Sequence, residues 1–594
     1  MLNTAQQQAV DADGHTLVVA LPGAGKTHMS VLKIDRLLSL HPQNRIGAVT
    51  FTRDSAEELK TRIVRVSGEE KAKRTLVGTF HKHSIIMLRA ANKMPKIVGG
   101  GQQFSILNRA IEMAEADMKA IDAAKILERI KCSAEQLPET ATEERLFNAY
   151  RELLSRHGMC DLQDVVRMAL NGMQDGTVPA LPVSHLLVDE FQDTDECQLQ
   201  WVLEHARRGA IITVVGDDDQ SIYGWRHALG YAGMMRFKEE VGAELINLGS
   251  NYRCRKEILD SAEKVIRNND NRVVKTMLAE RGPGGQVDYR KYADRANEVE
   301  AMIASILSTP GIIQEEGDFP LWRVPEGSWA VLARNNHLLR MISAEMTAAG
   351  VAHKLASSDK DMWAVPPLCY VADLLGSLAD GTTRGIENTM SMVGVSERCI
   401  TQLNDISKGR LKPLLKTMPK LVGVDKKEAD AVSNLLNLVA GWKEQIAQGR
   451  LNLGLQGVRS YVLAHVPAKM ASDLDFGVNI LVNKLRGSLA ERLKVVLKPR
   501  EDPRTENEDK RHVKLMTMHG SKGLEFDNVW LPAAETGIIP SEGGTEGPSD
   551  LEEERRLFYV GMTRAKNHLT VSHTSLATAS LFIKESGIPE TVLQ

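Results

Sequence analysis

The segment "VVGDDDQSIYGWRHA", residues 214–228, brings two kinds of chemistry together. Three aspartates and a glutamine follow a short apolar run, and Tyr223 and Trp225 come next, with Arg226 and His227 beside them. Acidic side chains at the end of a strand are typical of a metal or phosphate site. Aromatic side chains beside arginine on a loop are typical of a surface that stacks on flat rings. The segment therefore predicts a phosphate site and a ring-binding site that adjoin.

The segment "VVALPGAGKTH" has the pattern of a phosphate-binding loop, because it follows a predicted strand and opens a predicted helix. Gly23 and Gly25 allow backbone N–H groups to turn inward around phosphate oxygens. Lys26 supplies a positive charge to the β- and γ-phosphates, and Thr27 offers a hydroxyl to Mg²⁺. Ala20 stands where the first glycine of the motif is usual. A chance loop of glycine and lysine is the alternative, and a matching acidic strand counts against it.

That acidic strand is "HLLVDEFQD", residues 185–193. Asp189 at its carboxyl end is placed to hold Mg²⁺, and Glu190 can orient and deprotonate an attacking water. An Asp-Glu pair alone often does no more than cap a turn. Together with Lys26 and Thr27 it predicts hydrolysis of a nucleoside triphosphate, without indicating what the energy is used for.

Composition limits the class of protein. A chain of 594 residues with 43% hydrophobic and 25% charged residues is typical of a soluble protein with several domains. No run reaches the roughly 18 apolar residues of a membrane span, and the N-terminus lacks a signal peptide, so we expect a cytoplasmic protein. Six scattered cysteines argue against a disulfide framework and a zinc site. Because the net charge is −3, a site for a polyanion must be a local basic groove.

Two sets of short apolar runs alternate with helical segments, which predicts an α/β fold with two tandem parallel sheets. Each set is interrupted by a mainly helical insert, and in the second insert Val432 to Ile446 form an apolar stripe that we interpret as core packing. Residues 498–512 have the composition of a linker, and residues 537–550 that of a loop. The predicted strands are 16–20, 45–51, 75–80, 185–190, 211–217, 244–249, 328–335, 513–520, 528–534 and 568–572.

The order of the sequence blocks resembles that of the UvrD/Rep/PcrA family of superfamily 1A DNA helicases. The blocks are "LNTAQQQAV", "AVTFTRDSAEELKTR", "VGTFH", "VDEFQDTDECQ", "VVGDDDQSIYGWRHA", "NLGSNYRCRKEIL", "VKLMTMHGSKGLEF" and "EEERRLFYVGMTRAK". The resemblance implies two RecA-like P-loop domains, 1A and 2A, with helical inserts 1B and 2B. The implied segments are 1–85 and 166–247 for 1A, 86–165 for 1B, 248–365 and 508–594 for 2A, and 366–507 for a short, divergent 2B.

The resemblance also implies an ATP site that uses Mg²⁺. Gln6 corresponds to the glutamine that reads adenine, Tyr252 to an aromatic residue that stacks on the base, and Glu525 to a carboxylate near the ribose. Gln220 corresponds to a γ-phosphate sensor. Two arginine fingers, Arg253 and Arg564, would stabilise charge in the transition state. The phosphate loop contributes Pro22, Gly23, Ala24, Gly25, Lys26, Thr27 and His28.

A site for single-stranded DNA is implied as well, and closure of the ATP cleft would shift its aromatic pockets by about one nucleotide. Core packing remains the alternative for Phe51. The implied contacts are Phe51, Thr79, His81, Tyr223, Trp225, Arg226 and His519.

The expected function is 3′→5′ movement on single-stranded DNA and unwinding at junctions, by a monomer or weak dimer with the 2B insert available to a protein partner. The alternative is a DNA-gated ATPase subunit of a nuclease, repair or phage-defence complex with weak unwinding. A small-molecule kinase is a third reading, which the paired arginines and the aromatic loop count against. His28 departs from the arginine of relatives, and residues 356–367 replace an aromatic-rich stretch. Because few residues follow "HLTVSHTS", we expect no nuclease domain.

Overall fold

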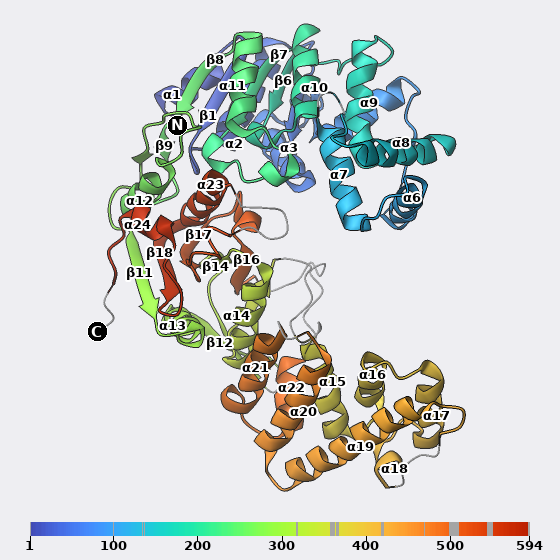
Figure 1. Ribbon diagram of the computed structural model, residues 1–594. Coiled ribbons are helices and arrows are strands. Elements are labelled where there is room, and N and C mark those ends of the chain that lie inside the picture. The colour runs from blue at the N-terminus through green and yellow to red at the C-terminus, as the bar shows by residue number, and fades with distance from the viewer. Residues whose placement is uncertain are drawn as a thin grey trace. The chain divides into compact units, whose positions relative to one another are not determined.

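The structure is a computed structural model (Figure 1). It describes residues 2–98, 100–133, 135, 137–316, 319–356, 363, 367–416, 421–467, 470–497, 510–542 and 550–591. Most of the predicted linker 498–512, half of the loop 537–550 and most of residues 356–367 therefore lie outside the described residues.

Two compact units make up the chain. The first comprises residues 1–287, 540–567 and 580–588, and the second comprises 288–539, 568–579 and 589–594. The first unit thus includes the segments around Arg253 and Arg564 together with the phosphate loop. The six-segment division into 1A, 1B, 2A and 2B stays a prediction.

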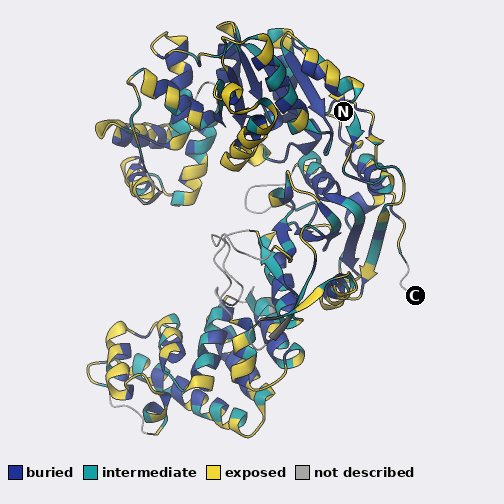
Figure 2. Ribbon diagram, turned by 180° about the vertical axis from the view of Figure 1, so that it is seen from behind, coloured by how far each residue is buried: buried dark blue, intermediate teal, exposed yellow. Residues whose placement is uncertain are grey.

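A six-stranded parallel sheet forms the centre of the first unit, in the order β3-β2-β6-β7-β1-β8. Its strands are apolar and buried in their central parts because helices cover both faces (Figure 2). Alternate residues face opposite sides, so that Leu186 and Val188 join one core and Leu187 the other. The strands are β1 (Thr16–Ala20), β2 (Ile46–Thr50), β3 (Thr75–Thr79), β6 (His185–Val188), β7 (Ile211–Gly216) and β8 (Glu244–Leu248).

Helices pack on the two faces of this sheet. One face is covered by α2 (Lys26–Leu40) and α3 (Arg53–Ser67), and the other by α5 (Phe80–Ala90), α9 (Leu162–Gln174), α10 (Glu196–Arg207) and α11 (Gly230–Val241). The remaining elements around the sheet are α1 (Thr4–Asp11), α4 (Glu69–Ala72), η1 (Phe191–Asp193), η2 (Asp218–Gln220), η3 (Gly224–Arg226), β9 (Ser250–Asn251), α12 (Lys256–Ile266), β10 (Leu278–Ala279), α23 (Leu551–Met562) and α24 (Leu581–Ser586).

The helical insert of the first unit has a small core of its own. Leu127, Ile130, Leu146 and Tyr150 are buried in it. Its elements are β4 (Lys96–Ile97), α6 (Gly100–Met113), α7 (Ala120–Cys132), α8 (Ala141–Arg156) and β5 (Met159–Cys160).

The second unit is built on another six-stranded sheet, in the order β11-β18-β17-β14-β16-β15. The pairs β14–β16, β14–β17 and β15–β16 are parallel. The expected α/β fold with two parallel-sheet domains and helical inserts is thereby confirmed. The elements are β11 (Gln286–Tyr292), α13 (Arg295–Leu307), β12 (Ile312–Glu316), β13 (Phe319–Arg323), β14 (Trp329–Ala333), α14 (Asn336–Ala348), β15 (His353–Leu355), β16 (Val513–Thr517), η7 (His519–Ser521), β17 (Phe526–Leu531) and β18 (Ala565–Thr574).

The second insert is mainly helical in its described parts. The predicted apolar stripe is buried from Val432 to Trp442, which confirms core packing, and Ile446 is partly buried against the same core. Throughout the described residues, no helix combines the length and apolar character that crossing a bilayer requires. The elements are α15 (Leu368–Asp380), α16 (Arg384–Met392), α17 (Glu397–Ser407), α18 (Leu411–Lys416), α19 (Lys426–Ala447), α20 (Leu451–His465), α21 (Ala471–Asn479), η6 (Ile480–Lys484) and α22 (Leu489–Val496).

Candidate nucleotide and nucleic-acid site

The phosphate loop joins β1 to the N-terminus of α2. Gly23 and Gly25 adopt left-handed backbone angles, with φ of 67° and 75°, which residues with a side chain rarely adopt. A Cβ atom on Gly23 would also lie 2.6 Å from Cβ of Arg253. The glycines of the motif are therefore required by conformation and by space, and the N–H groups at the start of α2 face the place where a phosphate would bind.

Lys26 lies beside the acidic strand end. Its Nζ is 3.3 Å from Oε1 of Glu190. Burial alone would lower the pKa of Lys26, but the carboxylates of Glu190, Asp217 and Asp189 outweigh that effect and raise it. Lys26 is thus held as a cation.

Glu190 is fixed by its own backbone and by a neighbour. It adopts a left-handed conformation with φ of 51°, which is costly for a residue with a side chain. Nε2 of Gln192 donates to its Oε2 at 2.6 Å. The hydroxyl of Thr27 and the carboxylate of Asp189 are hard oxygen donors of the kind that Mg²⁺ takes, so this end of the sheet fits the expected metal.

The expected adenine side lies at the other end of the loop. Gln6 is 4% exposed; its Oε1 accepts from the N–H of Asn3, and its Nε2 donates to the carbonyl of Ala24 at 2.9 Å. Tyr252 is 44% exposed, and its N–H donates to the carbonyl of Gly23. Its phenol oxygen accepts from Nδ2 of Asn3. Pro22 and Ala24 lie in the same loop and His28 lies in the first turn of α2, and their contact with ATP stays a prediction.

Asn251 attaches the Tyr252–Arg253 segment to the phosphate loop, and sequence reasoning missed it. Its Nδ2 donates to the carbonyl of Pro22 at 2.6 Å, and its Oδ1 accepts from the N–H groups of Arg253 and Cys254. The block "NLGSNYRCRKEIL" contained it, but nothing in the residue type set it apart from its neighbours.

The two predicted arginine fingers both belong to the first unit. Arg253 donates from Nη1 to the carbonyl of Thr563 at 3.3 Å. Arg564 is 1% exposed and donates to the carbonyl of Val560, to Oε1 of Gln220 and to the hydroxyl of Thr563. Burial lowers the pKa of Arg564 to about 9, and the nearby charge of Arg253 lowers it as well. A phosphate group beside these two cations would relieve that cost.

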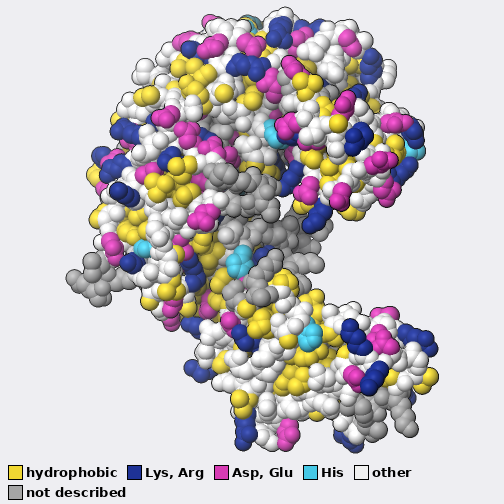
Figure 3. Space-filling view, viewed as in Figure 1, with side chains coloured by type: hydrophobic (Ala, Val, Ile, Leu, Met, Phe, Trp, Pro, Cys, Tyr) yellow, Lys and Arg dark blue, Asp and Glu magenta, His cyan; other side chains and the backbone are white. Residues whose placement is uncertain are grey.

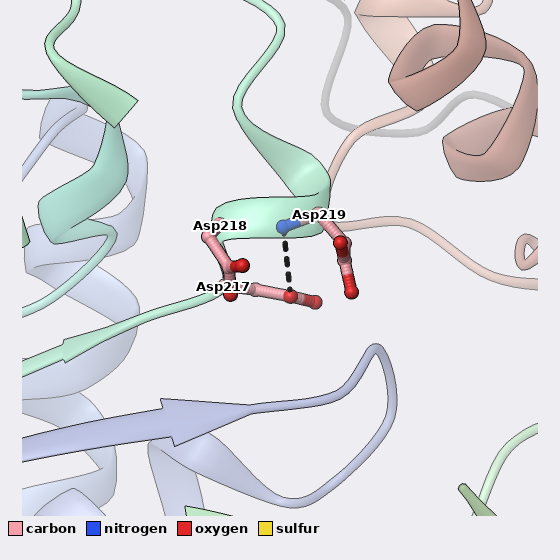
Figure 4. A group of neighbouring side chains, drawn as sticks. All are labelled: Asp217, Asp218 and Asp219. Atoms are coloured by element: carbon pink, nitrogen blue, oxygen red, sulfur yellow. Dashed lines mark hydrogen bonds between the residues drawn. The ribbon is translucent and has the colours of Figure 1, made fainter. Parts of the chain in front are cut away.

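The three aspartates of the opening segment converge (Figure 4). The cation between them is Lys275, whose fully buried Nζ lies 2.9, 2.6 and 2.9 Å from carboxylate oxygens of Asp217, Asp218 and Asp219. Arg272 adds a bidentate contact to Asp219. The acidic tip therefore binds an internal ammonium group, whereas its residue types suggested a metal or a phosphate. Lys275 was missed because a single lysine in "NRVVKTML" carries no signal of its burial.

The predicted aromatic contacts form one cluster. The rings of Phe51 and Tyr223 stack at 5.8 Å with an interplanar angle of 12°, and Trp225 meets Tyr223 edge-on at 6.3 Å. The guanidinium of Arg226 lies 4.6 Å from the ring centre of Trp225. Trp225 is 59% exposed. Phe51 is half-buried and lies against Tyr223, which favours a surface role over core packing.

A cavity of about 240 Å³ adjoins this cluster and brings Phe51, Thr79, His81 and Arg226 together. Burial lowers the pKa of His81, so that histidine is neutral near pH 7. Thr79 accepts from the N–H of Lys82 and caps α5. The other lining residues are Phe80, Glu128, Lys131, Cys132, Gln163, Val166, Asp193, Asp195, Cys197 and Gln198.

The acidic side chains of this cavity were not predicted. Burial raises the pKa of Asp195 to about 6, and its Oδ1 accepts from the N–H of Gln198 at the start of α10. On the face drawn in Figure 3, basic and acidic side chains are interspersed over the surface. The cavity thus offers rings and mixed charges rather than a purely basic lining.

Two predicted residues belong to the second unit. His519 lies in η7, where burial and the charges of Arg334 and Lys522 lower its pKa to about 4, and Glu525 lies just before β17. A second cavity, of about 230 Å³, is lined by His28, Val31, Arg62, Arg65 and Val66. Its arginines were also missed; their spacing in "TRIVRV" places both on one face of α3.

Comparison with known proteins decides the family. The N-terminal domain of UvrD/REP helicases matches residues 2–241, and the UvrD-like helicase C-terminal domain matches residues 246–361 and 471–576. The chain belongs to the UvrD/REP helicase family. The resemblance inferred from the sequence blocks is therefore confirmed, and residues 362–470 fall between the matched parts of the UvrD-like C-terminal domain.

Several curated relatives align over most of the chain. DNA helicase II of Escherichia coli (strain K12) is 26% identical over 98% of this chain and 85% of its own length. The ATP-dependent DNA helicase PcrA of Bacillus subtilis (strain 168) is 25% identical over 99% of this chain and 85% of its own. The ATP-dependent DNA helicase PcrA of Leuconostoc citreum is 26% identical over 96% of this chain and 82% of its own length. This UvrD/REP family member is thus similar to helicases along nearly its whole length.

Proposed function

We propose that this protein is an ATP-dependent DNA helicase that moves 3′→5′ along single-stranded DNA and uses ATP hydrolysis to separate strands. The names of its relatives, DNA helicase II and ATP-dependent DNA helicase PcrA, support the reaction. The observation that carries the proposal is that one short segment, residues 217–226, contributes both to the proposed phosphate site and to the aromatic cluster. In that segment Gln220 contacts Arg564, and Tyr223, Trp225 and Arg226 belong to the aromatic cluster.

In the proposed reaction, Lys26 and the N–H groups of the phosphate loop bind the β- and γ-phosphates. Mg²⁺, when bound through Thr27 and Asp189, would neutralise phosphate charge. Glu190 orients the attacking water and accepts a proton from it. Arg253 and Arg564 stabilise charge on the transferring phosphoryl group, with Gln220 oriented beside them. Gln6 and Tyr252 bind adenine, and Glu525 the ribose.

On the DNA side, Phe51, Tyr223 and Trp225 stack on bases. Stacking contributes about 1–3 kcal/mol per base and depends little on base identity, as a motor that crosses any sequence requires. Thr79, His81, Arg226 and His519 are proposed as further strand contacts. The same proposal includes a monomer or weak dimer that acts in the cytoplasm. It also includes the predicted bounds of 1A, 1B, 2A and 2B.

A second candidate is a DNA-gated ATPase that serves as a subunit of a nuclease, repair or phage-defence complex. One observation favours it: residues 362–470, which make up most of the helical insert, lie outside the UvrD-like C-terminal domain match. An insert of that kind offers a protein partner a surface of its own.

Strand-separation assays distinguish the two candidates. Duplexes with a 3′ or a 5′ single-stranded tail are incubated with the protein and ATP–Mg²⁺, with Lys26→Ala as the inactive control. We expect unwinding of the 3′-tailed duplex alone. ATP hydrolysis that DNA stimulates without any unwinding would favour the second candidate, and unwinding only from a 5′ tail would contradict the proposed direction.

A further inference from the structure

Helix α23 runs alongside the segment that joins the two halves of the site. Just beyond the helix, Nη2 of Arg564 donates to Oε1 of Gln220 at 3.0 Å. Within the helix, Nε of Arg556 donates to the carbonyl of Ser221 at 2.8 Å. One turn earlier, Glu553 accepts from the loop at Gly224. The stretch from Gln220 to Gly224 is therefore held at three points, two on α23 and one on Arg564 just beyond it.

The carboxylate of Glu553 lies against the backbone of Gly224. The N–H of Gly224 donates to Oε1 of Glu553 at 3.2 Å. A Cβ atom on Gly224 would lie 2.3 Å from Oε2 of Glu553 and 3.2 Å from its Cδ. Gly224 does not adopt a left-handed backbone conformation. A side chain at position 224 would therefore require the carboxylate of Glu553 to move.

Helix α23 is well suited to hold the loop. Leu557, Phe558 and Val560 on its inner face are at most 1% exposed. The inner face of α23 is buried, whereas Trp225, which follows Gly224 directly, is 59% exposed. An exposed aromatic residue that is already oriented loses less conformational entropy when a base stacks on it.

We propose that Glu553 is a positioning residue for DNA-stimulated ATP hydrolysis, which holds Gly224 and thereby orients Trp225 for stacking. Since Arg564 lies two residues after the end of α23, the helix also joins the γ-phosphate side of the site to the DNA side. The inference rests on the proposed function, because it assumes that DNA stimulates hydrolysis.

The test uses the full chain and four variants: Glu553→Ala, Glu553→Gln, Gly224→Ala and the double variant Gly224→Ala/Glu553→Ala. Basal ATP hydrolysis, the concentration of oligo-dT that gives half-maximal stimulation, and the melting temperature are measured for each. We expect both single alanine variants to need about two- to tenfold more oligo-dT, the effect of losing one hydrogen bond, with basal hydrolysis unchanged. Glu553→Gln keeps an acceptor oxygen and should behave as the wild type.

The double variant is the sharpest arm. If Gly224→Ala acts by displacing Glu553, the double variant should be no worse than either single variant. Provided that DNA stimulates the wild type, three results would each overturn the inference. The first is an additive loss of DNA stimulation in the double variant, and the second is an equal loss of basal and stimulated rates. The third is a Glu553→Ala variant that needs no more oligo-dT than the wild type. A wild type that DNA does not stimulate would overturn the proposed function as well. If Glu553→Ala does not fold, the oligo-dT dependence of Gly224→Ala, whose substitution lies on an exposed loop, tests the inference by itself.

Discussion

Gln220 donates from Nε2 to Oδ2 of Asp217 at 2.6 Å and accepts at Oε1 from Arg564 at 3.0 Å. Because a carboxylate only accepts and a guanidinium only donates, the amide has a single orientation that satisfies both partners. Asp217 is held in turn by Lys275. A chain of charged and polar contacts thus leads from a buried lysine to the proposed γ-phosphate site.

Lys275→Met should destabilise the first unit strongly. Removal of the ammonium leaves three buried carboxylates without their shared cation, a change of about 3–5 kcal/mol for a broken buried ion pair. Urea unfolding followed by fluorescence measures the effect. Lys256→Met is the matched control, because Lys256 is exposed and pairs only at the surface with Asp260; its unfolding midpoint should hardly move. Equal midpoints for the two variants would contradict the assigned role of Lys275.

Glu190→Gln should trap ATP on the protein. The amide keeps the shape of the side chain but cannot accept the proton of the attacking water, and loss of a general base slows reactions by about 10²–10⁴-fold. Single-turnover hydrolysis and nucleotide retention after gel filtration measure the two steps. Glu196→Gln, at the pair with Arg236 on α10 and α11, is the control and should turn over normally. Normal turnover by Glu190→Gln would remove it as the base.

Trp225→Ala should weaken DNA stimulation far more than the basal rate. Loss of one stacked ring is worth about 1–3 kcal/mol, or roughly 5- to 150-fold in the DNA concentration needed for half-maximal stimulation. Phe104→Ala is the control, because Phe104 on α6 is equally exposed, at 59%, and lies outside the aromatic cluster. Parallel loss of basal and stimulated rates in Trp225→Ala would count against stacking.

Asp195 should make stability depend on pH. Its pKa of about 6 in the folded chain lies above the unfolded value of about 3.9, so the folded state binds more protons between these values. Its contribution to stability is therefore greatest below pH 4 and is lost as the pH rises through 6. Asp195→Asn keeps the cap on α10 without the charge. The variant should raise the melting temperature more at pH 8 than at pH 5. An equal change in melting temperature at the two pH values would contradict the assignment of a buried, raised-pKa carboxylate to Asp195.

Much of the fold could be predicted from apolar runs. The run at 16–20 is β1, and the run at 211–217 ends one residue beyond β7. The strands that sequence reasoning missed in the second sheet are its two edges, β11 and β15. Edge strands have a neighbour on one side only and carry more polar residues, which removes the continuous apolar signal.

The contact between Lys26 and Glu190 was predictable, because short motifs encode both residues. The site was not predictable where side chains meet across long separations. Asn251 reaches the phosphate loop, and Lys275 reaches Asp217, only after folding. Neither residue type indicates such a partner, since a lysine is usually exposed and an asparagine in a loop usually forms a turn.

Coupling between DNA binding and ATP hydrolysis is measured by the ATPase rate of the purified protein with and without a single-stranded oligonucleotide. Retention of that oligonucleotide on a filter is measured in parallel. We expect the rate to rise severalfold with DNA and the oligonucleotide to be retained. Identical rates in both conditions, without retention, would contradict this coupling.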